Sequence, residues 1–313
     1  MSSSTTGRDD LLAQLATLTT EQFRPELAEI DRLPTLEIAR VMNGEDRSVP
    51  DAVAAQLPQI SAAIDAIAER MARGGRLIYL GAGTAGRLGV LDASECPPTF
   101  NTAPSQVVGV IAGGPSAMVT AVEGAEDSRE LAAADLDGLG LTAEDTVIGI
   151  SASGRTPYAI GAVEHARARG ALTVGLSCNA GSELAAAAEH GVEVVTGPEL
   201  LTGSTRLKAG TAQKLVLNMI STITMIRLGK TYGNLMVDVR ASNEKLHARS
   251  RRIVALATGA PDEEIEAALA ATGGEVKPAI LTILGRVDGP TATGLLAASD
   301  GHLRAALAAV PAP

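Results

Sequence analysis

The sequence has 313 residues, a formal net charge of −10 and only 2% aromatic residues. At roughly 100–200 residues per domain, this length allows one large domain with an appendage or two ordinary domains. A negative chain opposes non-specific binding to nucleic acids and anionic membranes, and few aromatic side chains are present for bases to stack on. The composition therefore predicts neither a nucleic-acid partner nor a membrane partner.

No apolar run approaches the roughly 18–20 residues that span a bilayer, and the first residues lack the apolar core of a signal peptide. We therefore expect a cytoplasmic protein. Cys96 and Cys178 lie far apart without CxxC spacing, and the four histidines are isolated from one another. Neither a disulfide framework nor a metal site is expected from these residues.

In chain order, residues 1–20 are polar and expected to be frayed, and a Pro–Thr pair starts a short helix near 33–42. Apolar residues then recur every three or four positions from 49 to 72, which is typical of an amphipathic helix. The next segment alternates between strands predicted at 77–80, 107–111, 146–150, 172–176 and 192–195 and helices predicted at 84–95, 115–134, 157–169 and 182–190. This alternation predicts an α/β fold, a doubly wound parallel sheet of about five strands in a three-layer α/β/α arrangement.

The C-terminal part is predicted to be helical. Long helices are expected at 204–228 and 234–257, followed by shorter ones at 262–271, 276–285 and 300–309 that glycine and proline separate. The predicted division of the chain is an N-terminal segment with helices (1–65), an α/β domain (66–230), a connecting helix (231–258) and a small three-helix unit (259–313).

Two glycine- and hydroxyl-rich turns each follow a predicted strand and precede a predicted helix. Their candidate binding residues are Gly83 and Thr84 in the first turn and Ser151, Ser153, Gly154 and Thr156 in the second. Helix starts offer unpaired backbone N–H groups and a partial positive charge, and glycine lets a ligand approach the backbone. The turns therefore predict a divided cradle for the phosphate of a small molecule, the alternative being two ordinary tight or capped turns.

A dinucleotide is a weaker interpretation of the first turn. Gly81, Gly83 and Gly86 match the spacing of the dinucleotide fingerprint, which also requires an acidic residue about 20 positions later. The second predicted strand instead ends in Ile-Ala-Gly-Gly at 111–114, so NAD is not expected.

Ser204 and Lys208 stand at the start of the long helix predicted at 204–228. A capped helix start explains such residues, and a third wall of the phosphate pocket is the functional alternative.

Two glutamates are candidates for proton transfer. Glu95 precedes Cys96 and two prolines, which are expected to end its helix and to fix its position, and Glu126 lies in an acidic stretch after the second strand. A glutamate is usually solvated on the surface, which is the alternative for both. Cys96 has no histidine base nearby in sequence, which favours packing over a role as nucleophile.

Six blocks together resemble the N-acetylmuramic acid 6-phosphate etherases, which are sugar-isomerase-domain proteins related to the glucokinase regulatory protein. The matching blocks are 81–87, 91–98, 123–129, 153–158, 203–214 and 234–238, and the resemblance extends from about residue 30 to residue 259. It implies a sugar-isomerase domain and an enzyme without a cofactor. Its implied reaction cleaves the lactyl ether of N-acetylmuramic acid 6-phosphate, giving N-acetylglucosamine 6-phosphate and D-lactate in cell-wall sugar recycling.

The resemblance also implies residue roles. The family mechanism is an elimination at the open-chain aldehyde followed by addition of water, in which Glu126 matches the base at C2 and Glu95 matches the acid that protonates departing lactate. The sugar phosphate is implied as the small-molecule partner. A homodimer with a shared pocket is implied as well, with His247 or Lys208 as candidates to enter the neighbouring site. Ala85 departs from the serine common in the family, so a hydroxyl contact is lost there or passes to Thr84.

Two other functions remain as alternatives. A sugar-phosphate isomerase on the same fold also moves a C2 proton, but elimination needs a second acid, which favours the lyase when two glutamates are present. A sugar-phosphate-sensing regulatory protein is the non-enzymatic alternative. Such relatives carry two sugar-isomerase domains or a DNA-binding helix-turn-helix, whereas this sequence has the pattern of one sugar-isomerase domain and no basic recognition helix.

Overall fold

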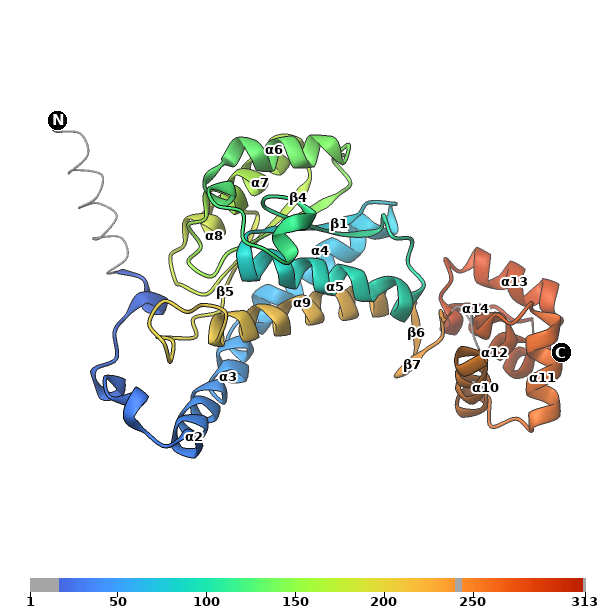
Figure 1. Ribbon diagram of the computed structural model, residues 1–313. Coiled ribbons are helices and arrows are strands. Elements are labelled where there is room, and N and C mark those ends of the chain that lie inside the picture. Colours follow the sequence, from blue (N-terminus) through green and yellow to red (C-terminus); the bar gives the residue numbers. More distant parts are fainter. Residues whose placement is uncertain (1–16, 240–243, 312–313) are drawn as a thin grey trace. The chain divides into compact units, whose positions relative to one another are not determined.

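The computed structural model describes residues 17–239 and 244–311 (Figure 1). Backbone contacts divide the chain into two compact units, the first comprising Met1–Ser94 and Val107–Ile220 and the second Glu95–Gln106 and Ser221–Pro313. The helices α5 (Gly83–Phe100) and α9 (Lys208–Arg227) contribute residues to both units. The predicted boundaries at 65, 230 and 258 follow the sequence pattern, whereas the contacts divide the chain inside these two helices.

From residue 17 on, the N-terminal segment contains three short 3₁₀ helices and three α-helices. They are η1 (Thr19–Glu21), η2 (Pro25–Leu27), η3 (Ile30–Arg32), α2 (Thr35–Asp46), α3 (Val49–Ala54) and α4 (Leu57–Ala72). The single helix predicted for 49–72 is therefore two, because Pro58 in the first turn of α4 has no N–H to continue the hydrogen-bond ladder of α3. The expectation of a frayed 1–20 segment is wrong at its end, since Leu18 and Thr20 are buried; residues 1–16 lie outside the described residues.

A parallel five-stranded sheet forms the centre of the first unit, as predicted. Its strands are β1 (Leu77–Gly81), β2 (Val107–Ile111), β3 (Thr146–Ile150), β4 (Leu172–Ser177) and β5 (His190–Glu193), in the spatial order β2-β1-β3-β4-β5. Burial on both faces explains why β1, β3 and β4 read as continuous apolar runs rather than as alternating patterns.

Helices cover both faces of the sheet. Figure 1 shows α6 (Arg129–Gly138) and α7 (Pro157–Ala168) on one face and α4 and α5 on the other, while α8 (Glu183–Ala187) packs near β4 and β5. Tyr158 of α7 packs with Ile78 and Val147 of the sheet in one buried cluster. Gly89 permits the close approach of α5, because a Cβ there would lie 2.9 Å from the Cβ of Tyr79. The α/β/α layering is the predicted one.

The helices predicted at 115–134 and at 84–95 have wrong limits. The segment predicted as helix at 115–134 contains two 3₁₀ turns, η4 (Pro115–Met118) and η5 (Ala125–Asp127), before α6 begins. Helix α5 continues through Pro97 and Pro98 to Phe100 instead of ending before them. A proline loses its own N–H but keeps its carbonyl, and Asn101 N still donates to Pro97 O at 3.0 Å, so the last turn closes.

The second unit is helical, with a small antiparallel pair of strands. It contains β6 (Thr231–Tyr232), β7 (Leu235–Met236), α10 (Glu244–Thr258), α11 (Asp262–Ala271), α12 (Val276–Gly285), α13 (Gly289–Ala298) and α14 (Leu303–Ala308). The start of the helix predicted at 234–257 is wrong, because β7 occupies 235–236 and α10 begins at Glu244. The predicted three-helix tail misses α13, whose Gly-Pro start is typical of a turn. The Asp288 side chain accepts a hydrogen bond from Thr291 N at 2.8 Å and caps that start. None of the helices in the described residues has the length and apolarity to cross a bilayer.

Candidate active site

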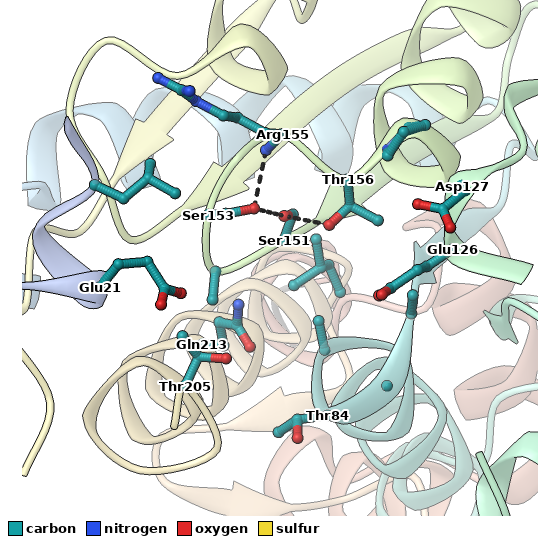
Figure 2. Close-up of a pocket in the computed structure, with 17 residues that line it drawn as sticks. Glu21, Thr84, Glu126, Asp127, Ser151, Ser153, Arg155, Thr156, Thr205 and Gln213 are labelled. Atoms are coloured by element: carbon teal, nitrogen blue, oxygen red, sulfur yellow. Dashed lines mark hydrogen bonds between the residues drawn. The ribbon is translucent and has the colours of Figure 1, made fainter. Parts of the chain in front are cut away.

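The two glycine-rich turns leave the sheet at neighbouring positions. Gly81 at the end of β1 pairs with Ile150 at the end of β3. The chain continues from β1 to β2 on one side, while β3 lies on the other side, so the strand order reverses between β1 and β3. Ligands of open α/β sheets bind outside the carboxyl ends of strands at such a reversal. A cavity of about 570 Å³ lies there (Figure 2).

The first turn brings the backbone at the start of α5 to the cavity wall. A Cβ at Gly86 would lie 2.4 Å from the carbonyl oxygen of Gly81, so the tight passage from β1 into α5 requires glycine. Gly83, Thr84 and Ala85 line the cavity, with Gly83 at a φ of +53°. The helix start therefore presents backbone N–H groups together with one hydroxyl, that of Thr84.

The second turn gathers three hydroxyl groups before α7. Ser151 Oγ lies 3.2 Å from Ser153 Oγ and 2.8 Å from Thr156 Oγ1, and it accepts a hydrogen bond from Gly154 N at 3.0 Å. The three hydroxyl residues line the cavity, whereas Gly154 shapes the turn at a φ of +69°. Hydroxyl groups that now bond to one another can turn to donate to an anion. The arrangement is suited to a phosphate group at the start of a helix.

Carboxylates line the cavity on two sides. Glu126 and Asp127 come from η5, after β2, and Glu21 comes from η1 in the N-terminal segment. Figure 2 shows Glu126 and Glu21 pointing into the cavity from opposite sides, with the hydroxyl turn between them. Arg155 also lines the cavity and donates from Nη2 to Thr17 Oγ1 at 3.2 Å. Acidic groups therefore flank the two glycine- and hydroxyl-rich turns and are placed to accept protons or hydrogen bonds from a bound molecule.

The start of the long helix predicted at 204–228 does contribute to a third wall of the cavity, but sequence reasoning missed the residues that line this wall. Glu21, Thr205 and Gln213 line it, together with the buried Leu18. The η1 segment is anchored by Asn179, whose Oδ1 accepts hydrogen bonds from Thr19 N and Thr19 Oγ1, both at 2.8 Å. No local pattern indicated Leu18 and Glu21, because the anchor lies far along the chain and the segment up to residue 20 was expected to fray.

The predicted residues Lys208 and Ser204 do not line the cavity. Lys208 is 4% exposed, and its Nζ lies 2.9 Å from Glu45 Oε2 on α2. The buried carboxylate of Glu199 accepts hydrogen bonds from Lys208 N and Ala209 N, both at 2.9 Å, and so caps the start of α9. Thr205, the next residue after Ser204, lines the cavity instead.

The predicted acid Glu95 is exposed on α5, about three helical turns after Thr84, and it is not among the residues lining the cavity. His247 lies on α10 and lines a different cavity, inside the second unit. Among the candidate acid–base residues of the described chain, Glu126 lines the cavity at the two glycine-rich turns, whereas Glu95 and His247 are not among its lining residues.

Both cysteines are buried. Burial, and then the nearby charge of Glu199, raises the pKa of the Cys178 thiol to about 12. A thiol with that pKa is protonated at neutral pH, which makes Cys178 a packing residue rather than a nucleophile.

Two family models match the chain. The glucokinase regulatory protein N-terminal SIS domain matches residues 59–167, and the SIS domain matches residues 127–223. An N-acetylmuramic acid 6-phosphate etherase from Streptomyces avermitilis is 85% identical over 96% of this chain and 97% of its own length. The chain belongs to the N-acetylmuramic acid 6-phosphate etherase family.

Further relatives have the same name. An N-acetylmuramic acid 6-phosphate etherase from Streptomyces coelicolor is 80% identical over 98% of both chains, and one from Rubrobacter xylanophilus is 63% identical over 94% of this chain and 97% of its own. A solved phosphoheptose isomerase from Francisella tularensis matches 62% of this chain and all of its own at 18% identity, with a TM-score of 0.48. The resemblance noted from the sequence is thus confirmed, and it extends over the C-terminal helices.

Proposed function

We propose that this member of the etherase family cleaves the D-lactyl ether of N-acetylmuramic acid 6-phosphate, as a carbon–oxygen lyase. The observation that carries the proposal is the cavity of about 570 Å³ at the strand-order reversal. Both glycine- and hydroxyl-rich turns and the carboxylate of Glu126 line this cavity. A sugar phosphate is of suitable size for such a cavity. Family membership supplies the chemical identity of the ether.

The phosphate is bound by the two turns in this proposal. Ser151, Ser153 and Thr156 donate hydroxyl hydrogen bonds, and the start of α5 around Gly83 and Thr84 adds backbone N–H groups. Binding the phosphate at one end places the carbons of the opened sugar beside the carboxylates. Such positioning lowers the entropic cost of bringing reacting groups together.

Two proton transfers carry the elimination. Glu126 removes the C2 proton, which is acidic because the adjacent C1 is an aldehyde in the open chain, and the C3–O bond to lactate then breaks. Glu95 protonates the lactate oxygen as it departs, so the leaving group is an alcohol rather than an alkoxide. Water adds to the resulting unsaturated aldehyde at C3 and C2 is protonated, giving N-acetylglucosamine 6-phosphate. Each positioned proton transfer contributes about 10²–10⁴ in rate.

The proposal includes a cytoplasmic homodimer with a shared pocket. Supporting it is the position of Glu95, which does not line the cavity of its own chain and is exposed on α5. Glu95 of a neighbouring chain is then a candidate to complete the pocket. His247, exposed on α10, remains a second candidate to enter it. Lys208, which is paired with Glu45, is a weaker candidate for such a role.

The test is lactate release from N-acetylmuramic acid 6-phosphate by the purified chain, with a chelator present and with the variants Glu126→Gln and Glu95→Gln. We expect chelator-resistant release that falls about 10²–10⁴-fold in each variant. Glu144→Gln is the matched control, because Glu144 is half-buried, pairs with Arg73 and precedes β3 at the opposite end of the sheet. Full activity in Glu126→Gln would remove the base assignment.

Reaction in deuterated water separates the lyase from the other candidates. Protonation of C2 after water addition leaves solvent deuterium at C2 of the product, together with free lactate. An isomerase exchanges a proton without releasing lactate. A sensor binds the sugar phosphate and neither releases lactate nor exchanges the proton.

A further inference from the structure

Gln213 on α9 is a buried polar residue whose amide nitrogen is unpaired in the described part of the structure. It lines the cavity but is only 1% exposed, and its Nε2 has no hydrogen-bond partner among the described residues. Figure 2 shows its amide group pointing into the cavity. Buried amide groups in native proteins are nearly always paired, since an unpaired one is unfavourable. An orphaned donor in the wall of a binding cavity indicates that a ligand supplies the acceptor.

Glu21 provides a hydrogen-bond acceptor on the same wall, whereas Gln213 provides a donor. Its carboxylate lies against Gly203, where an added Cβ would be 2.6 Å from Oε2, and Thr205 in the same loop also lines the cavity. Gly203 N donates to Thr20 O at 3.2 Å, so this loop and the η1 segment are joined. The wall therefore contains a carboxylate, which only accepts hydrogen bonds, and an amide nitrogen, which donates.

We propose that Gln213 and Glu21 form a subsite for the 2-acetamido group of the sugar phosphate. A secondary amide has one N–H donor and one carbonyl acceptor, so Glu21 accepts from the N–H and Gln213 donates to the carbonyl oxygen. This inference rests on the proposed function, because it identifies which group of that substrate faces this wall. Gln213 and Glu21 are then specificity-determining residues for amino sugars.

The charge of Glu21 favours a neutral acceptor over an anionic one. A phosphate or the lactyl carboxylate placed on this wall would be repelled by Glu21, whereas the acetamido carbonyl carries no charge. The same repulsion keeps the phosphate at the hydroxyl turn, where Ser151, Ser153 and Thr156 line the cavity. The sugar is thus oriented in the cavity, with its phosphate at the hydroxyl turn and its acetamido group at Glu21 and Gln213.

The experiment compares two sugar phosphates that differ at C2. Calorimetric titration measures the affinity of N-acetylglucosamine 6-phosphate and of glucose 6-phosphate for the wild type and for Gln213→Met, which keeps the side-chain size and removes the donor. We expect Gln213→Met to bind N-acetylglucosamine 6-phosphate about tenfold more weakly and glucose 6-phosphate equally well. Glu21→Gln is also expected to lose the preference for N-acetylglucosamine 6-phosphate over glucose 6-phosphate. Gln59→Met, at an exposed position of α4, is the matched control.

Thermal unfolding of the free protein distinguishes a ligand-binding role of Gln213 from a structural role. Because Nε2 of Gln213 has no partner in the described structure, Gln213→Met is expected to keep or raise the melting temperature of the free protein. A lower melting temperature with unchanged affinities would indicate a structural role and overturn the proposal. Equal loss of affinity for both sugar phosphates would overturn it, as would no loss for either.

Titration with N-acetylmuramic acid 6-phosphate shows whether Gln213 donates to the acetamido carbonyl or to the lactyl carboxylate. If Gln213→Met weakens only N-acetylmuramic acid 6-phosphate, the lactyl carboxylate is the acceptor and the acetamido assignment is wrong. The proposed function is tested apart from this, by lactate release in the wild type. Absence of lactate would end the lyase proposal, while the comparison at C2 would still decide the subsite.

Discussion

At Gly154 the backbone has a φ of +69°, and an added Cβ would lie 2.4 Å from the Cβ of Ser182. Only glycine adopts this conformation without strain, and only glycine avoids the neighbouring side chain. The hydroxyl groups of Ser151 and Ser153 depend on the path of the chain through this residue, because the backbone N–H of Gly154 bonds to Ser151 Oγ. A substitution of Gly154, which does not itself line the cavity, should therefore displace the hydroxyl groups of Ser151 and Ser153 that do.

We predict that Gly154→Ala lowers the free energy of unfolding by about 1–3 kcal/mol and weakens binding of inorganic phosphate. Urea unfolding and phosphate inhibition of lactate release measure the two effects. Gly181→Ala is the matched control, since Gly181 has a φ of +63° but no atom within 4 Å of an added Cβ. If the control weakens phosphate binding equally, strain at positive φ rather than the clash with Ser182 is responsible.

Single residues of the site differ in how far the sequence indicates them. Ser151, Ser153 and Thr156 belong to one turn, so their meeting depends on local backbone geometry and is predictable. Gln213 lies inside a block that matches the family, yet nothing in its neighbours indicates an unpaired amide. Lack of a partner depends on everything that packs around a side chain, and sequence spacing does not contain that information.

Helix α2 is tied to the first unit chiefly by polar contacts. No residue of α2 is buried, and Glu45 near its end bonds to Arg24 at 2.7 Å and to Lys208 at 2.9 Å. The hydrogen bond from Arg24, and then that from Lys208, lowers the pKa of Glu45 against the opposing effect of burial. A carboxyl group with a lowered pKa in the folded state stabilises the fold above its ordinary pKa, and this stabilisation is lost as the pH falls through the folded value.

We predict that Glu45→Gln lowers the free energy of unfolding by about 1–3 kcal/mol near neutral pH, because Lys208 is left buried without its anion. The difference from the wild type should shrink as the pH falls, since protonated Glu45 also lacks the charge. Denaturant unfolding between neutral and acid pH measures this. The double variant Glu45→Gln/Lys208→Met should regain part of the stability, and a loss no smaller than that of Glu45→Gln alone would contradict a charge-pair explanation.

The same variants test the expected role of Lys208 in sugar-phosphate binding. A raised KM that persists in the double variant after stability is regained would support direct binding. An unchanged KM would assign Lys208 to the ion pair with Glu45. Helix starts rich in hydroxyls and lysine suit both roles, which is why the sequence pattern at 203–214 left them open.

At the scale of the whole molecule, the second unit has a buried cluster of its own. The second unit is centred on α12, where Leu281 is 0% exposed and packs in a cluster with residues of α10, α11, α13 and α14. Because that cluster contains only residues of the second unit, we expect the two units to unfold in separate transitions.

We predict that Leu281→Ala destabilises the second unit by about 2–5 kcal/mol and lowers one of two calorimetric transitions. Leu284→Ala is the matched control on the same helix, because Leu284 is 39% exposed and leaves a smaller cavity. A single transition that shifts as a whole in Leu281→Ala would show that both units unfold together.

The sequence by itself determined the α/β fold class, the approximate position of every strand of the large sheet and the two glycine- and hydroxyl-rich turns that line the cavity. These features depend on periodicity, chain punctuation and local backbone geometry, which neighbouring residues decide. Only the tertiary structure decided that Glu21 and Gln213 share a cavity wall with the turns and that Lys208 pairs with Glu45. Lys208 and Glu45 are 163 positions apart, and packing of the whole chain is what brings such residues together.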